Sequence, residues 1–347
     1  MRVLILSHDD VHKALTPEEC ADAMASVLAA HARGEAFMPL RSIMAPPGAA
    51  GFMGLMPGWR GAKAEAETEA DEHDLPEPPP PDKAVFSLKA ICLIPGNPAR
   101  GLDAHQGIVT LFDGETGVPT AILDASAVTE IRTAAVTAVA TRELARKDAR
   151  ALAILGAGVQ ARSHLKALLK VRPFDHVRIY APTEAHAQAV VDEAPETDAE
   201  LSVAPSAELA VSGADVVVVA TSSREPVLNR EWLSIGAHVN AVGASTPTAR
   251  EIDVPTVADS ALFCDSRESL RNEAGEYLLA ITEGAIAGED HVRAELGEVL
   301  AGLKPGRTDD TELTMFRSLG LAVEDLAAAE YAVAVARSNG IGTEVEL

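Results

Sequence analysis

Residues 151–161 read Ala-Leu-Ala-Ile-Leu-Gly-Ala-Gly-Val-Gln-Ala, and they decide the fold of this 347-residue chain. The apolar run 152–155 predicts a buried strand, and the Ala-, Leu- and Lys-rich segment after Ala161 predicts a helix. Gly156 permits a tight turn, Gly158 lets a pyrophosphate approach the backbone, and Ala161 lets the helix pack closely on the strand. The helix N-terminus offers unpaired N–H groups to phosphates. The stretch therefore predicts a dinucleotide site, and the alternative is a glycine-containing turn that binds nothing.

Apolar runs and helical segments alternate along the chain from residue 149. Run 214–220 is apolar apart from Asp215, which is typical of a strand covered on both faces. The alternation predicts an α/β fold with a doubly wound parallel sheet of the Rossmann type. The strands are expected to end near Leu155, Tyr180, Ala220, Val242 and Cys264. Ligands of such sheets lie beyond the carboxyl ends of the strands, so the predicted crevice is lined by residues 156–160, 181–183, 221–223 and 243–246.

The first 125 residues follow a different pattern, which predicts a smaller, largely antiparallel α+β region. Thr16 followed by Pro17 predicts the start of a helix that continues to residue 33, and Ser126 is expected to cap a helix that reaches residue 146. Residues 61–83 are rich in acidic residues and proline, which predicts an exposed insertion without chemistry. Strands are expected at 3–6, 84–93, 107–112 and 118–123.

Composition excludes several classes of protein. The formal net charge of −23 argues against binding to nucleic acid or to an anionic membrane surface. Cys20, Cys92 and Cys264 are far apart and form no C-x-x-C motif, so neither a disulfide framework nor a structural zinc site is expected. No apolar run is long enough for a transmembrane helix, and the N-terminus does not have a signal-peptide pattern. The expected compartment is the cytoplasm.

Three basic residues occupy apolar surroundings and are candidates for chemistry. Lys89 lies inside a predicted strand, Arg132 inside an Ala- and Thr-rich helix, and Arg41 at a strand start. A buried cation needs a negative partner. For any one of them, that partner can be a structural Asp or Glu. Together, the three residues suggest a pocket that binds a substrate carboxylate.

The histidines do not point to a metal centre. His105, His164 and His238 lie near predicted turns or strands, and none of these three has a second ligand at a metal-binding spacing. Each is more simply explained as a hydrogen-bonded structural residue, so no metal is predicted.

The residues after the second predicted strand bear on the cofactor. An NAD site usually has Asp or Glu at the end of that strand. Here Tyr180 is followed by Ala181-Pro182-Thr183, without a carboxylate. An NAD(P) cofactor is therefore predicted, with NADP favoured and Thr183 as a phosphate contact.

Several stretches in the same order resemble the ornithine cyclodeaminase/mu-crystallin family. They are 52–57, Lys89, 101–107, 111–117, 129–135, 156–161, 242–245, 250–251 and 316–320. The resemblance implies a substrate-binding and dimerisation domain formed by 1–128 with 320–347, a Rossmann domain at 129–319, and a homodimer. It implies that Lys89 and Arg132 are catalytic and bind the substrate together with Arg41, Ser245 and Leu319. The implied cofactor contacts are Gly156, Gly158, Val159, Gln160, Ala181, Thr183, Thr221, Val242, Gly243 and Ser318.

One position separates the branches of this family. Cyclodeaminases carry an aspartate where this chain has Ser245, and without it no general base for amine cyclisation is evident. The resemblance therefore implies an NAD(P)-dependent oxidoreductase that reduces an imino acid or a 2-oxo acid. Two alternatives stay open: an ornithine cyclodeaminase-type ammonia lyase with bound NAD, and a non-catalytic NADPH-dependent protein that binds small molecules.

Overall fold

A computed structural model describes residues 1–62 and 83–347. The chain divides into two compact units: unit 1 comprises Met1–Arg132 and Leu321–Leu347, and unit 2 comprises Thr133–Gly320. Each has its own sheet, which confirms the predicted α/β class with a parallel sheet and a second, mixed one. The predicted insertion at 61–83 lies, except for its first two residues and its last, outside the described residues.

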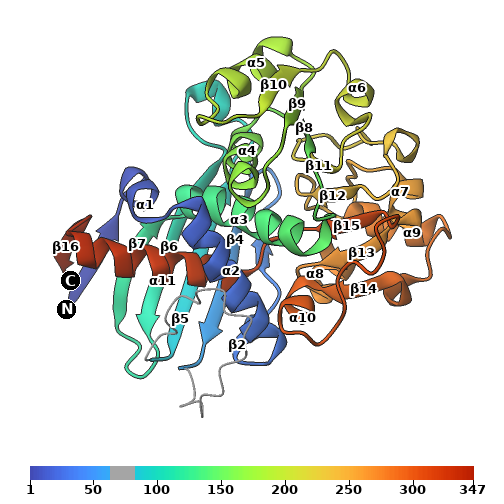
Figure 1. Cartoon of the computed structure of the whole chain (residues 1–347). Coiled ribbons are helices and arrows are strands. Elements are labelled where there is room, and N and C mark those ends of the chain that lie inside the picture. The colour runs from blue at the N-terminus through green and yellow to red at the C-terminus, as the bar shows by residue number, and fades with distance from the viewer. Residues whose placement is uncertain (63–82) are drawn as a thin grey trace. The chain divides into compact units, whose positions relative to one another are not determined.

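Unit 1 is built on one mixed sheet (Figure 1). Neighbouring strands are antiparallel except β1 and β7, which are parallel. The order across the sheet is β16 (Thr343–Glu346), β1 (Arg2–Leu6), β7 (Pro119–Asp124), β6 (His105–Asp113), β5 (Val85–Leu93), β4 (Phe52–Arg60) and β2 (Ala36–Phe37), and β3 (Ser42–Met44) pairs with β4.

Helices cover one face of this sheet. They are α1 (His8–Ala14), α2 (Pro17–Ala32), α11 (Ala322–Asn339) and the first turns of α3 (Ala125–Leu144), with a short 3₁₀ turn at Pro98–Arg100. Figure 1 shows α2 and α11 lying side by side across the strands. Because side chains alternate along a strand, β5 directs Ser87, Lys89 and Ile91 toward the helices and leaves Phe86 on the other face, 47% exposed.

The start of α3 differs from the prediction. The helix begins at Ala125, and the Asp124 carboxylate accepts the Ala127 N–H at 2.8 Å. Ser126 lies inside the helix and donates its hydroxyl to the His105 carbonyl. The predicted Ser126 cap is therefore wrong, because the preceding aspartate already satisfies an open donor of the first turn.

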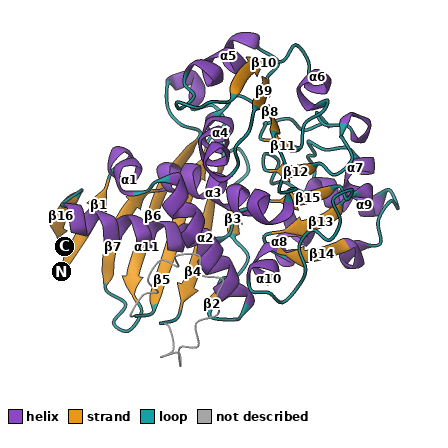
Figure 2. Ribbon diagram, in the orientation of Figure 1, coloured by secondary structure: helices purple, strands orange, loops and turns teal. Residues whose placement is uncertain are grey.

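Unit 2 is a sheet of parallel strands with helices around it (Figure 2). The order is β10 (Glu200–Val203), β9 (His176–Tyr180), β8 (Ala151–Leu155), β11 (Val216–Val219), β12 (His238–Ala241), β15 (Thr314–Arg317), β13 (Ala261–Cys264) and β14 (Val292–Glu295). The helices, besides the rest of α3, are α4 (Val159–Val171), α5 (Glu184–Asp192), α6 (Ala207–Val211), α7 (Val254–Asp259), α8 (Arg267–Glu273), α9 (Gly275–Thr282) and α10 (Leu296–Leu300), with 3₁₀ turns at Arg230–Trp232 and Gly288–His291.

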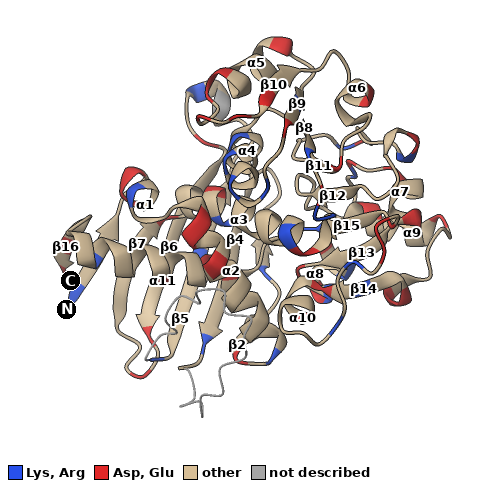
Figure 3. Ribbon diagram, in the orientation of Figure 1, with Lys and Arg blue, Asp and Glu red and all other residues tan. Residues whose placement is uncertain are grey.

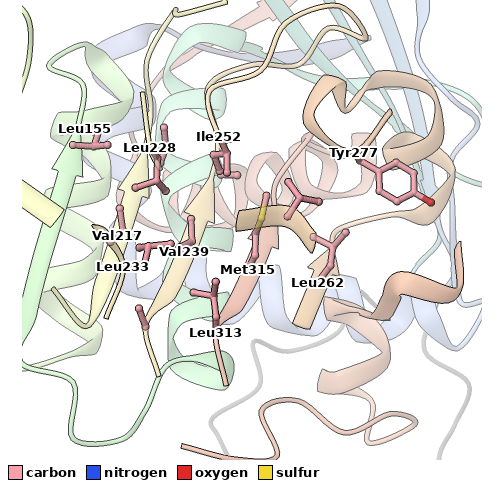
Figure 4. Packing of buried hydrophobic residues seen from close by; sticks show 14 of the residues in the cluster. Leu155, Val217, Leu228, Leu233, Val239, Ile252, Leu262, Tyr277, Leu313 and Met315 are labelled. Carbon is pink, nitrogen blue, oxygen red and sulfur yellow. The ribbon is translucent and has the colours of Figure 1, made fainter. Parts of the chain in front are cut away.

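The apolar run of β11 shows why this sheet needs helices on both faces. Val217 and Val219 belong to one buried cluster, which Figure 4 shows around Val239 and Met315. Val216 and Val218 belong to a second buried cluster. Since consecutive side chains point to opposite faces, a continuous apolar run is the pattern of a strand buried on both sides.

Candidate cofactor and substrate sites

The glycine turn after β8 has the geometry that a phosphate cradle requires. Gly156 has a φ of +123°, and a Cβ there would lie 2.3 Å from the Ala220 carbonyl oxygen. Gly158 is the N-cap residue of α4, and a Cβ there would meet no atom within 4 Å, so the space around it is open. Ala161 is fully buried against the sheet. The first glycine is needed for the turn, and the second leaves the α4 N-terminus accessible.

Polar atoms at α4 and after β15 remain available for a ligand. The N-cap position of α4 has no side-chain hydrogen bond. Among the described residues, the buried Gln160 Oε1 and Ser318 Oγ have no hydrogen-bond partner. Val159 is half-exposed. An open helix N-terminus whose first turn carries a buried polar atom without a partner, Gln160 Oε1, fits a dinucleotide, whose pyrophosphate needs N–H donors and whose remaining groups need polar contacts.

The other predicted cofactor residues follow the carboxyl ends of neighbouring strands. Ala181 and Thr183 come after β9, Thr221 after β11, and Val242 and Gly243 after β12. Thr183 is exposed and forms the N-cap of α5 without a side-chain hydrogen bond. The chain order of these strands reverses between β8 and β11, which is the switch point where ligands bind in open α/β sheets.

A buried carboxylate that sequence reasoning missed ties two of these loops together. Glu251 is 1% exposed and accepts the Thr221 N–H at 2.7 Å, the Thr221 hydroxyl at 2.5 Å and the Ala244 N–H at 2.6 Å. A Cβ on Gly243 would lie 2.3 Å from this carboxylate, so only glycine fits there. Burial raises the pKa of Glu251 to about 7. Thr221 thus uses its hydroxyl within the protein.

A second set of buried charges holds the segment after β15. Arg317 pairs with Glu276 at 2.9 Å, and both are fully buried. Asp265 accepts the N–H groups of Leu319 at 2.5 Å and Gly320 at 2.7 Å. These contacts hold Ser318 and Leu319 in place just after the carboxyl end of β15. Ser245, the other predicted substrate residue of unit 2, is exposed in the loop after β12.

In unit 1, the structure brings two of the three predicted cations to one carboxylate. Lys89 Nζ lies 3.0 Å from Asp325 Oδ1, and Arg132 Nε lies 2.9 Å from the same oxygen. Arg132 Nη1 also donates to Glu324 Oε2 at 3.0 Å. All four side chains are at least 94% buried. We call these four residues the buried charge cluster.

The pKa values in this cluster reflect burial opposed by pairing. Burial lowers the pKa of Lys89 to about 8, and the charges of Arg132 and Arg41 act in the same direction, whereas Asp325 opposes them. Burial disfavours the charged form of Asp325, but Lys89 and Arg132 together hold its pKa below its ordinary value. Burial also lowers the pKa of His105 to about 4. The positive charge of Lys89 acts in the same direction, and the negative charge of Asp325 opposes it. Arg41 lies close enough to this cluster for its charge to lower the pKa of Lys89.

Sequence reasoning found the cations of this cluster but not its anions. Glu324 and Asp325 lie in the Ala-rich helix α11, where they are buried. The pattern that indicates Lys89 and Arg132, a charged residue among apolar neighbours, also occurs at these two acids and could have indicated them.

Two further observations concern the apolar helices and the charged positions of the described residues. Within the described ranges 1–62 and 83–347, no helix is long and apolar enough to span a bilayer. Acidic and basic positions are interspersed along the elements of both units (Figure 3).

Comparison with known proteins gives consistent results. The family model for the ornithine cyclodeaminase/mu-crystallin family matches residues 62–339. The ketimine reductase mu-crystallin of Mus musculus is 36% identical over 297 residues, which cover 86% of this chain and 84% of that protein.

Two of the solved structures that match this chain illustrate the similarity. The Delta(1)-pyrroline-2-carboxylate reductase of Thermococcus litoralis, solved with NADH and L-proline, has a TM-score of 0.89 and 34% identity, over 99% of this chain and 100% of that one. An archaeal alanine dehydrogenase, solved as a dimer with bound NAD, has a TM-score of 0.88 and 32% identity, over 100% of both chains. The predicted resemblance is confirmed: this chain belongs to the ornithine cyclodeaminase/mu-crystallin family.

Proposed function

We propose that this protein is an NAD(P)H-dependent oxidoreductase that reduces the C=N bond of an imino acid to give an amino acid. The imine is either cyclic or formed from a 2-oxo acid and ammonia. The observation that carries this proposal is the burial of two cations, Lys89 and Arg132, on one carboxylate oxygen of Asp325. The relatives that reduce imines or oxidise alanine support the reaction class.

The buried charge cluster has suitable chemistry for an α-imino carboxylate. The guanidinium of Arg132 binds a carboxylate in a defined plane, and the charge of Arg41 adds to the attraction. The Lys89 ammonium has three donors, and its bond to Asp325 uses one. With a pKa of about 8, Lys89 holds a proton at neutral pH and can still release it, as a general acid requires.

The reaction balances with one cofactor and one proton. A bound reduced nicotinamide would supply the hydride for the imine carbon. Lys89 donates a proton from Nζ to the imine nitrogen and is reprotonated from water. Ser245 provides no carboxylate to deprotonate a substrate amine, which favours reduction over amine cyclisation.

The test follows absorbance of the nicotinamide band. The purified enzyme is given NADPH or NADH with a cyclic α-imino acid, with pyruvate plus ammonia, or with ornithine. We expect cofactor oxidation with an imine or oxo acid, its loss in Lys89→Met, and its retention in Lys83→Met, which changes an exposed lysine of the same unit. Ammonia release from ornithine without net absorbance change would replace the proposal with a cyclodeaminase. Cofactor binding without turnover would replace it with a binding protein.

The residue after β9 leads us to propose NADPH as the preferred cofactor. Ala181 stands where NAD-selective sites place a carboxylate for the ribose 2′-hydroxyl. Ala181→Asp should therefore shift the ratio of kcat/KM values toward NADH by about tenfold, which corresponds to about 1.4 kcal/mol. Glu184→Gln, at the exposed first residue of α5, is the control and should leave the ratio unchanged. An unchanged ratio in Ala181→Asp would contradict this preference.

We also propose that the protein is a homodimer that associates through the face of the unit 1 sheet opposite α2 and α11. Leu55, Phe86 and Ile108 are 38%, 47% and 45% exposed on adjacent strands. Apolar side chains grouped in this way are typical of an interaction surface. The related alanine dehydrogenase that was solved as a dimer supports this arrangement.

A further inference from the structure

Two histidines near the N-terminus lie together with a glutamate in an arrangement that suits a metal ion. His8 and His12 are four residues apart on α1, so their side chains lie on the same face of the helix. Their ring centroids are 4.7 Å apart. One ligand atom each of His8, His12 and Glu130 lies within 4.8 Å of the other two. All three belong to unit 1.

The separation of two of these ligand atoms is close to the one that first-row metal coordination sets. His12 Nε2 lies 3.6 Å from Glu130 Oε2. Two ligands at about 2.1 Å from a tetrahedral zinc ion are about 3.4 Å apart. The two atoms are therefore already separated by nearly the distance that a shared ion would set, and are too far apart for a direct hydrogen bond.

A further carboxylate orients His8. His8 Nδ1 lies 3.1 Å from Asp124 Oδ1. If Nδ1 carries the proton and donates it to Asp124, Nε2 has the free lone pair that can bind a metal ion. This is the usual arrangement of a carboxylate, a histidine and zinc. Asp124 is itself held in place, because the same oxygen accepts the Ala127 N–H at the start of α3. The two carboxylates also provide the negative charge that a divalent cation requires.

Hydrogen bonds hold the backbone that carries these side chains. Ser7 and Asp10 form a reciprocal capping box at the first turn of α1, where His8 is the first helical residue. Glu130 lies in the second turn of α3. The side chains of His8 and His12 are 45% and 36% exposed, so an ion can reach them from solvent, whereas Glu130 is 17% exposed.

We propose that His8, His12 and Glu130 bind one divalent transition-metal ion of the zinc class, with Asp124 as the residue that positions His8. Two imidazoles and one carboxylate favour Zn²⁺, Co²⁺ or Ni²⁺ over Mg²⁺ and Ca²⁺, which prefer oxygen ligands. Three protein ligands leave a coordination position for water. Such an ion would link α1 to the first turns of α3, the helix that also carries Arg132 of the buried charge cluster.

The test uses the full-length protein without a histidine tag and Co²⁺ as a spectroscopic probe. We expect one Co²⁺ per chain, a visible absorption band of a low-coordinate site, displacement by Zn²⁺ and no displacement by excess Mg²⁺. His12→Gln should abolish the band. His176→Gln should not, although His176 also pairs with a glutamate at 3.2 Å on the surface. Asp124→Asn, which retains a side-chain acceptor for the α3 cap, should weaken binding by about tenfold or more.

The melting temperature without metal serves as the folding control for each variant. Zn²⁺ should raise it in the parent protein and in His176→Gln but not in His12→Gln or Glu130→Gln, because a ligand stabilises only a state that binds it. Binding that survives in both His12→Gln and Glu130→Gln would overturn the proposal. So would the absence of saturable binding, or an equal loss in His176→Gln.

Discussion

In the proposed mechanism, Lys89 combines a structural role with a catalytic one. It lies at the middle of β5 with its ammonium against Asp325, and burial lowers its pKa to about 8. A protonated lysine both attracts a carboxylate and supplies a proton. As pH rises through the pKa, Lys89 loses its proton, and both contributions are lost.

The rate of imine reduction should therefore fall as pH rises above about 8. In Lys89→Arg the charge persists at all accessible pH values, but the guanidinium does not release a proton. We expect kcat to fall by about 100-fold at neutral pH. The wild-type alkaline limb should also disappear from the pH profile of kcat/KM. Lys83→Arg is the control, and an unchanged limb in Lys89→Arg would assign it to another group.

Glu251 has a comparable structural importance in unit 2. Its two oxygens accept the three hydrogen bonds from Thr221 and Ala244, and one of these oxygens becomes an NH₂ group in Glu251→Gln. A buried donor then faces another donor, which costs about 1–3 kcal/mol. We expect a lower free energy of unfolding and weaker NAD(P)H binding, measured by urea titration and by fluorescence. Glu225→Gln, an exposed residue nearby, should change neither.

At the scale of elements, the β8–α4 turn separates two reasons for a glycine. Position 156 requires glycine because its φ is +123° and because a Cβ there would collide with the Ala220 carbonyl. Gly158 has an ordinary φ of −82° and open space around it. The first is needed by the fold, whereas the second is needed only if a ligand approaches.

Matched alanine substitutions distinguish these reasons. Gly156→Ala should lower the free energy of unfolding by about 2 kcal/mol or more, because both the backbone and Ala220 must move. Gly158→Ala should change stability by less than about 1 kcal/mol. It should nevertheless raise the Kd for NADH at least about tenfold, since the new methyl group occupies the approach of the pyrophosphate. Equal Kd values for Gly158→Ala and the parent would place the pyrophosphate elsewhere.

At the scale of the whole molecule, the helices among the described residues cover one face of the unit 1 sheet. The apolar residues of the other face are consistent with the proposed homodimer. Ile108→Lys places a charge at this face and should shift the sedimentation coefficient from dimer toward monomer. Ile235→Lys, at a position 73% exposed in unit 2, should leave the dimer intact. A monomeric parent protein, or a dimer that tolerates Ile108→Lys, would refute the proposed interface.

The sequence by itself determined the local features of this protein. The alternation of strands and helices in unit 2, the glycine turn at 156–158 and the basic residues in apolar segments were all predicted, because periodicity and turn sterics depend on neighbouring residues. The family was also recognisable, since its motifs are short contiguous stretches in a constant order.

Only the tertiary structure decided which charges meet. Lys89 and Asp325 are 236 positions apart, and Arg132 reaches the same carboxylate from a third element. The same holds for Glu251 and Thr221, and for His8 and His12 with Glu130. Such contacts depend on how strands and helices pack, which no local pattern records. Pairs of charges from different elements change pKa values and bring candidate site residues together. These properties depend on tertiary packing, whereas the fold class could be predicted from the sequence.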